Sequence, residues 1–119
     1  IPDVKLLTMG KYQRRKGLSF ERAVANDLKP IFPEAKRHLE VQMQEAQGYD
    51  LDNTGEWRVQ CKAMAKVPNI PKVFKEFTKL TDENIPVIVF SVTNKGEYAC
   101  VKWTDMLLLM QAWENKKTV

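Results

Sequence analysis

Residues Pro86 to Val92 form a run, PVIVFSV, in which apolar residues follow one another without alternation. Such a run is typical of a β-strand that is buried on both faces. A strand of this kind needs other strands beside it and helices above and below it, because neither of its faces can be left in water. The run therefore predicts the central strand of a helix-covered sheet, which is an α/β architecture.

A hairpin is predicted before this central strand. Over residues 56–64, apolar and polar residues alternate, so the two sets should face opposite sides of a sheet. Residues 53–55 supply the turn, and residues 49–51 the partner strand. Two further strands are expected at residues 36–43, for which the pattern also allows a helix, and at residues 97–103, after a tight turn at Lys95-Gly96.

Helical spacing of apolar residues appears in three segments. The first spans residues 18–29, where Ser19 could cap the helix and Pro30 should end it. The second spans residues 72–80. The third begins after Thr104, which is expected to cap it. It is apolar nearly all round, which suggests burial by a partner subunit as well as by its own core. The predicted fold is a central mixed five-stranded sheet flanked by helices.

Length and composition indicate one globular domain over residues 1–119, with residues 1–10 as a flexible N-terminal arm. Hydrophobic residues make up 44% of the chain, enough for a packed core. No apolar run approaches the ~20 residues of a membrane span, and no signal peptide is recognisable, so a cytoplasmic protein without a membrane partner is expected. Cys61 and Cys100 lie in apolar strands and are interpreted as small buried residues. A single histidine makes a structural zinc site very unfavourable.

The net charge of +4 lies in one short segment. Residues 11–22 carry a local charge of +4, while the remainder has 14 basic and 14 acidic side chains. A concentrated basic segment on a balanced chain is expected of a phosphate-binding surface, because each cation that neutralises a phosphate releases condensed counterions. A solvated charge run is the alternative. The predicted DNA-binding residues are Lys11, Arg14, Arg15 and Lys16.

Polar residues of the predicted hairpin carry the strongest chemical signal. Gln60 and Lys62 are two residues apart on one strand and must share a face, and a short hairpin brings Asp50 beside them. A carboxylate, an amide oxygen and an ammonium group would then meet. Oxygen ligands of this kind suit a hard divalent cation, which can polarise a phosphodiester, while the lysine steadies the nucleophile or the developing charge.

An acidic residue followed by (Asp/Glu/Gln)-x-Lys on an apolar strand resembles the PD-(D/E)xK nuclease superfamily. Within that superfamily, the segment YQRRKGLSFERAVANDL is similar to the start of archaeal-type Holliday junction resolvases, including their phage-encoded relatives. The resemblance covers roughly residues 11–103. It implies a restriction-endonuclease-like core, magnesium dependence with manganese as a substitute, and a homodimer that acts on a four-way DNA junction. A phage-encoded protein would act in the host cytoplasm.

The resemblance also implies roles for individual residues. The catalytic set would be Glu21, Asp50, Gln60 and Lys62. The metal ligands would be Glu21, Asp50, the Gln60 side-chain oxygen and the backbone carbonyl of Cys61. Gln60 departs from the family pattern, because it stands where an acid is usual and brings no negative charge to a metal. Asp52 is a second-ranked substitute.

Other interpretations remain open on the sequence alone. The chain could be a flap, nicking or restriction-like nuclease of the same superfamily, or a DNA-binding module that lost catalysis at Gln60. Glu21 could be a solvated helix residue, and Lys62 could cover a strand edge. His38 is interpreted as a surface or phosphate-contacting residue rather than a catalytic base.

Overall fold

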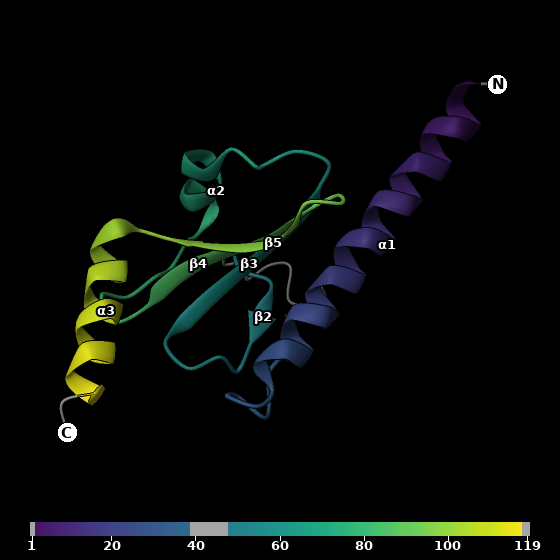
Figure 1. The fold of residues 1–119 in the computed structure, drawn as a ribbon. Helices are drawn as coiled ribbons and strands as arrows, with labels where there is room; N and C mark the ends of the chain where they lie inside the picture. The colour runs from purple at the N-terminus through teal and green to yellow at the C-terminus, as the bar shows by residue number, and fades with distance from the viewer. Residues whose placement is uncertain (1, 39–47, 118–119) are drawn as a thin grey trace.

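The structure, a computed structural model, describes residues 2–38 and 48–117, and the side chains of residues 15–38 and 48–117. Three helices and five strands follow one another in the predicted order (Figure 1). Their bounds are α1 Pro2–Leu28, β1 Lys36–Arg37, β2 Leu51–Asp52, β3 Trp57–Met64, α2 Ile70–Glu76, β4 Ile85–Val92, β5 Gly96–Val101 and α3 Trp103–Lys117. No helix in the described ranges is both long enough and apolar enough to span a membrane.

The apolar run at residues 86–92 forms β4, and β4 is the central strand of a three-stranded sheet. It pairs in parallel with β3 and antiparallel with β5, so Val89 lies between Cys61 and Ala99. The sheet is therefore mixed. The parallel pair requires a crossover, which the segment containing α2 supplies.

The prediction of one five-stranded sheet is not met in the described part of the chain, where five strands form two sheets. β1 and β2 are two residues each and pair only with one another, antiparallel. Beside β3, the Asp50 N–H donates to the Val59 carbonyl at 2.7 Å, but the chain then turns at Asn53 and Gly55, both with positive φ. The β2 strand is too short to extend this contact into a ladder.

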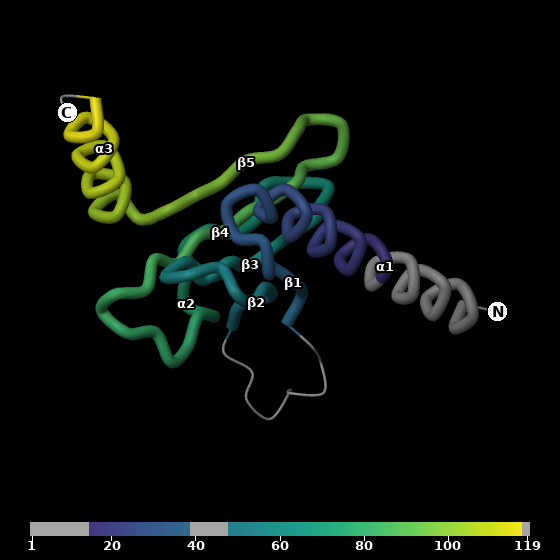
Figure 2. Tube along the Cα trace, turned by 90° about the horizontal axis from the view of Figure 1, so that it is seen from below, coloured from purple at the N-terminus to yellow at the C-terminus, as the bar shows by residue number. Residues whose placement is uncertain are grey.

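Two apolar clusters cover the two faces of the three-stranded sheet. On one face, Phe20, Val24 and Ala25 of α1 pack against Val59 and Cys61 of β3. On the other face, two side chains from the α2 segment pack against three of β4; they are Val73, Phe77, Ile88, Phe90 and Val92. Figures 1 and 2 show α1 and α2 on these opposite sides. The odd-numbered residues of the strands thus pack toward α1 and the even-numbered ones toward α2, as the alternation predicted.

The first helix is much longer than predicted. It ends at Leu28, ahead of Pro30, as expected, but it begins at Pro2, so Ser19 lies inside the helix and is not its cap. The expected arm therefore belongs to the helix over residues 2–10, and residue 1 lies outside the described residues. Between residues 3 and 29 the chain has no proline, and Gly17 costs at most about 1 kcal/mol relative to alanine in a helix.

The remaining boundaries differ by a few residues. The predicted strand at 36–43 is formed at Lys36–Arg37, and residues 39–43 lie outside the described residues. The α2 helix begins two residues earlier than predicted, because the Asn69 side chain caps it by accepting from the Lys72 N–H at 3.3 Å. The α3 helix begins at Trp103, so Thr104 is not its cap.

No residue of α3 is buried, so its apolar surface is not covered by the core of its own chain. The helix leaves the end of β5 and stands apart from α1 (Figures 1 and 2). Five of its large side chains are exposed, namely Trp103, Leu107, Leu108, Met110 and Trp113. The expected burial of this helix in its own core is wrong, and the expected partner subunit remains a prediction.

Candidate functional site

Asp50 lies at the edge of the sheet, just before β2. Its carboxylate Oδ2 accepts a hydrogen bond of 2.7 Å from the backbone N–H of Cys61. Its own backbone N–H donates to Val59, and its carbonyl accepts from the His38 N–H, both at 2.7 Å. Two of these contacts hold Asp50 against the outer edge of β3, where the hairpin pattern predicted it, and the third joins it to the residue after β1.

Gln60 and Lys62 point from β3 to the same side, as their spacing predicted. Both reach one oxygen of Glu76, at the end of α2. Gln60 Nε2 donates to Glu76 Oε2 at 2.8 Å, and Lys62 Nζ lies 3.4 Å from the same atom. Lys62 thus has an acidic partner in α2. A lysine that only covered a strand edge would not need such a partner.

Glu76 was not identified from the sequence. One helical turn separates it from Val73, which is buried, and Phe77 follows it directly. A helix that packs Val73 on the sheet places the residue three positions later near the same face. The spacing of apolar residues in α2 therefore indicates that Glu76 lies near the sheet. That it meets Gln60 and Lys62 of β3 depends on how the crossover places the helix.

Gly48 explains how the chain before β2 approaches α2. Its φ is +77°, and a Cβ atom at this position would lie 1.9 Å from the backbone oxygen of Glu76. Any side chain here would displace either the end of α2 or the segment that carries Asp50. Glycine is therefore required both by the left-handed conformation and by the close approach.

Glu21 reaches the Asp50 region from α1, across the other face of the sheet. Its Oε2 accepts from Arg37 Nε at 3.1 Å, so part of its charge is already neutralised by β1. It is close enough to Asp50 to raise the pKa of that carboxyl group. Glu21 is thus an inward-facing residue with a partner, not a solvated one.

Electrostatics single out Asp50. Burial raises its pKa from 3.8 to about 6, an effect opposed by the Cys61 N–H and by Lys62 and reinforced by the nearby carboxylates of Glu21 and Glu76. Burial, with Asp50 and Glu21 nearby, also raises the pKa of the Cys61 thiol, which stays protonated and inert. Three carboxylates face two cations, Lys62 and Arg37, which leaves a local excess of negative charge that a further cation would relieve.

The Gln60 amide contains an unusual feature. Gln60 is only 6% exposed, and while its Nε2 binds Glu76, its Oε1 is buried without a hydrogen-bond partner. A buried acceptor left unpaired costs about 1–3 kcal/mol. Reversing the amide would place Oε1 against the Glu76 carboxylate, which is less favourable. The orientation therefore leaves one oxygen available within the acidic cluster.

The predicted metal ligands are brought together only in part. Cys61 donates its N–H toward Asp50, and in a strand the carbonyl of the same residue points to the same edge. Asp50 and the Cys61 carbonyl thus border one edge of β3, while Gln60 projects from the face that meets Glu76 of α2. However, among the side chains of residues 15–38 and 48–117, no three His, Cys, Asp or Glu groups form a set that could hold a metal.

Asp52 and His38 pair with each other rather than with the Asp50 cluster. His38 Nδ1 lies 2.8 Å from Asp52 Oδ1, and His38 Nε2 is buried without a hydrogen-bond partner. Within the described part of the chain, neither forms a hydrogen bond or ion pair with Gln60 or Lys62. Asp52 is therefore engaged elsewhere in the described structure. His38 is half-buried, with 16% of its side chain exposed, and its interpretation as a surface or phosphate-contacting residue stays a prediction.

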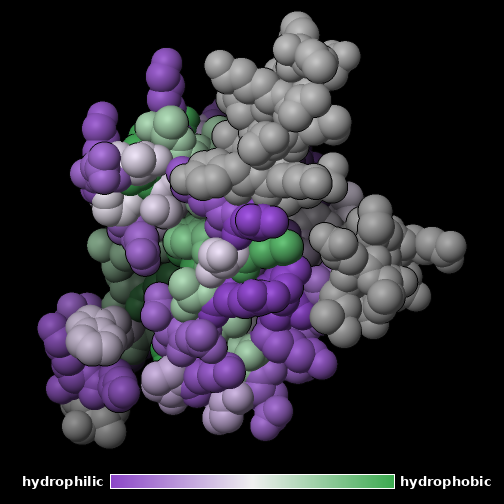
Figure 3. Space-filling view, turned by 90° about the vertical axis from the view of Figure 1, so that its right-hand side faces the viewer, coloured by the Kyte–Doolittle hydropathy of each residue, from purple (hydrophilic) through white to green (hydrophobic). Residues whose placement is uncertain are grey.

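The predicted DNA-binding residues are described only in part. The side chains of Lys11 and Arg14 lie outside the described residues. Arg15 is exposed, and Lys16 Nζ donates to Thr93 Oγ1 at 3.1 Å, which ties α1 to the end of β4. On the face seen in Figure 3, hydrophilic side chains gather in the lower half, at the level where α1 ends in Figure 1.

Comparison of this chain with protein-family models, with curated proteins and with solved structures finds no match. The case for a function therefore rests on Asp50 and the polar groups around it.

Proposed function

We propose that this protein is a magnesium-dependent DNA endonuclease of the PD-(D/E)xK type with a restriction-endonuclease-like core, which resolves four-way junctions. One observation carries the proposal. The buried carboxylate of Asp50 lies at the edge of β3, near Lys62 and Glu76, and the Gln60 amide that donates to Glu76 keeps a buried oxygen without a hydrogen-bond partner. This combination of hard oxygen donors and a nearby ammonium group suits metal-assisted hydrolysis of a phosphodiester.

The residues present fit a divalent cation. Asp50 would supply charge, while Gln60 Oε1 and the Cys61 carbonyl would supply neutral oxygens, and the unpaired Oε1 would gain the partner it lacks. Glu21 would complete the set after it leaves Arg37. Bound Mg²⁺, for which Mn²⁺ should substitute, would polarise the scissile phosphate and offset its developing charge.

The chain's own groups would orient the reaction. Lys62, held by Glu76 on one side, directs an N–H donor toward the attacking water or a phosphate oxygen. Asp50 must be ionised to act, and its raised pKa means that acid below about pH 6 protonates it. The arrangement also excludes the Cys61 thiol as a nucleophile, because that thiol is buried and protonated.

Binding of the junction would use the basic part of α1, with Lys11, Arg14, Arg15 and Lys16 on phosphates. Contacts of this kind position DNA without reading its sequence, which suits selectivity for shape. A second copy of the chain would supply a second site, and the uncovered α3 offers an apolar surface for that dimer.

A second candidate function is a DNA-binding module without catalysis. The specific observation is that Glu76 already satisfies both the Gln60 amide nitrogen and the Lys62 ammonium. Such a closed network could stabilise the fold with no cation at all. In that case Gln60 marks the loss of the usual acidic ligand.

Cleavage of labelled four-way junction and linear duplex, with and without Mg²⁺, tests the first function. We expect magnesium-dependent cutting of the junction in preference to the duplex. Asp50→Asn and Lys62→Met should each lower the rate by at least about a hundredfold, while junction binding in EDTA persists. Asp82→Asn, which changes an exposed loop residue, is the matched control and should cut normally.

The two candidates give different results. Tight junction binding without cutting, together with no heat of Mg²⁺ or Mn²⁺ binding in calorimetry, would favour the non-catalytic module. Cutting of flap or nicked substrates in preference to the junction would retain the nuclease and replace the substrate. Equal activity of Asp50→Asn and the wild type would refute the proposed site.

A further inference from the structure

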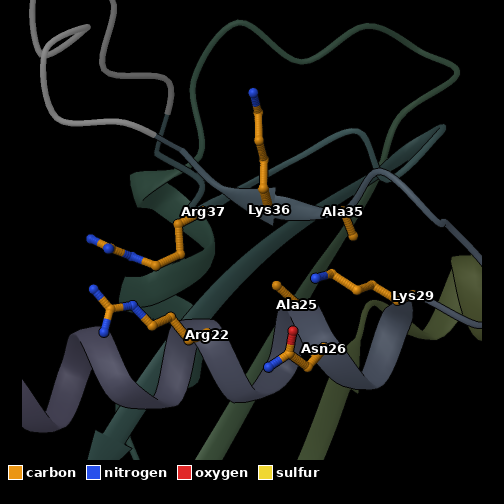
Figure 4. A pocket seen from close by; sticks show the side chains of 7 residues that line it. All are labelled: Arg22, Ala25, Asn26, Lys29, Ala35, Lys36 and Arg37. Atoms are coloured by element: carbon orange, nitrogen blue, oxygen red, sulfur yellow. The ribbon is translucent and has the colours of Figure 1, made fainter.

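A basic cleft lies between the C-terminal part of α1 and β1 and is separate from the proposed cation ligands. Four cationic side chains line it, together with Asn26. Arg22 comes from α1, Lys29 from the turn directly after it, and Lys36 and Arg37 from β1. Its volume is about 290 Å³. Figure 4 shows Arg22 and Arg37 extending side by side at one end, Lys29 reaching in between the two elements, and Lys36 standing at the rim.

The shape of the cleft follows from small residues and helical spacing. Ala25 of α1 and Ala35 before β1 are both buried and form its floor. Arg22 and Asn26 are four residues apart and lie along one side of α1, and Lys29 follows in the turn that continues from the helix. Alanines at the floor leave room that larger side chains would fill, and the longer polar side chains are left around it.

The charge in the cleft is mostly uncompensated. Arg37 pairs with Glu21, but Arg22, Lys29 and Lys36 form no ion pair with any residue in the described ranges. Like charges that gather around one cavity repel each other, and an anion that enters it relieves the repulsion. Guanidinium and ammonium groups with free N–H donors are the usual partners of phosphate oxygens.

The cleft and the Asp50 region are joined through Arg37. The Arg37 guanidinium lines the cleft and donates to Glu21, which in turn lies within electrostatic range of Asp50. Glu21 and Arg22 are consecutive residues of α1, so one helix turn presents an acid to the proposed site and a base to the cleft. A chain of phosphates could therefore occupy both regions at once.

We infer that this basic cleft binds the phosphate backbone of the DNA next to the cleaved phosphodiester, an inference that rests on the proposed nuclease function. The contacts are to phosphates, since the cleft offers cations and one amide rather than flat apolar surfaces for bases. Its recessed form, joined to Glu21 through Arg37, suits a strand that continues toward Asp50 better than a flat lipid surface. Phosphate binding would also draw Arg37 away from Glu21 and release that carboxylate for a cation.

Equilibrium binding of a fluorescent four-way junction in EDTA tests the inference without any need for cleavage. Affinity is measured from about 50 to about 400 mM salt, because each phosphate contact to duplex DNA contributes about 0.9 to the slope of log affinity against log salt. The test variant is Arg22→Gln with Lys29→Gln and Lys36→Gln. We expect its slope to fall by two to three and its affinity at about 100 mM salt to fall at least tenfold.

A matched control removes the same charge elsewhere. Lys66→Gln, Lys95→Gln and Lys116→Gln together replace three exposed lysines that do not line the cleft. This triple variant should change the slope by less than one. An equal loss in both triple variants would show that only net charge matters and would overturn the inference, as would wild-type protein that does not bind the junction.

Two further arms distinguish other ligands and other failures. Displacement of the junction by millimolar inorganic phosphate, or binding to phosphatidylserine vesicles that the cleft variant alone loses, would assign the cleft to another anion and overturn the inference. If the cleft variant loses its salt slope but the wild type shows no magnesium-dependent cutting, the nuclease proposal fails while backbone binding stands. If the wild type cuts normally and the cleft variant keeps the wild-type salt slope, the nuclease proposal stands and the inference about the cleft fails.

Discussion

Replacement of Asp50 by asparagine should stabilise the folded protein at neutral pH while it removes the proposed activity. The carboxylate is buried near Glu21 and Glu76, and burial disfavours its charged form. Asparagine is nearly the same size and keeps an oxygen that can accept from the Cys61 N–H. The substitution therefore removes a charge without creating a cavity or an unpaired backbone donor.

The expected magnitude follows from the pKa. Asp50 has a pKa of about 6 in the folded protein and 3.8 as its ordinary value, and each tenfold change in proton affinity is about 1.4 kcal/mol. Because the folded state binds the proton more tightly, the free energy of unfolding decreases as the pH rises from about 4 to about 6. Above pH 7 the penalty reaches about 3 kcal/mol, whereas at pH 4 it is under about 1 kcal/mol.

Urea unfolding of wild type and Asp50→Asn, in EDTA at pH 4 and pH 8, measures this difference. We expect the variant to be more stable than wild type by up to about 3 kcal/mol at pH 8, with most of the gain lost at pH 4. Asp82→Asn is the control, because Asp82 is exposed and its variant should stay within about 0.5 kcal/mol of wild type at both pH values.

The reasoning is refuted if Asp50→Asn is no more stable than wild type at pH 8, or if its gain is the same at both pH values. The first result would mean that Lys62 and the Cys61 N–H offset the burial of the charge completely. The second would mean that the gain has a cause other than ionisation of Asp50.

Two other predictions concern Gly48 and α3. Gly48→Ala should lower stability by more than about 2 kcal/mol in thermal or urea unfolding, because its Cβ would clash with the Glu76 backbone at a positive φ. Gly17→Ala is the control, since its added Cβ has no atom within 4 Å, and it should raise stability by about 0.5–1 kcal/mol. Equal effects of the two substitutions would contradict the close approach. Leu108→Glu, at a side chain 62% exposed, should convert a dimer to a monomer in sedimentation velocity, while Gln111→Glu on the same helix should not, and a monomeric wild type would rule out this interface.

Much of the fold followed from local patterns. The unbroken apolar run placed β4 at the centre of a sheet, because no exposed face could accept it. The alternation in β3 separated Cys61, which packs under α1, from Gln60 and Lys62, which meet Glu76. Period-two and helical spacing depend only on near neighbours in the chain, so they can be read without knowledge of the tertiary structure.

The limits of the sequence appear where contacts join distant segments. Glu76 lies 16 residues after Gln60, and the crossover decides that they meet. Arg37 captures Glu21 for the same kind of reason, and this contact keeps Glu21 from being a ready metal ligand. The basic cleft likewise combines a side of α1 with β1 and has no local signature across both elements.

The amino-acid sequence alone determined the order of the elements, the central place of β4 and the shared face of Gln60 and Lys62, since each depends on spacing within one segment. Tertiary structure alone decided which carboxylates surround Asp50, how strongly burial raises its pKa, and that β1 and β2 form a separate pair. Those outcomes depend on contacts between segments that are far apart in the sequence, and on how much water these contacts exclude from the Asp50 carboxylate.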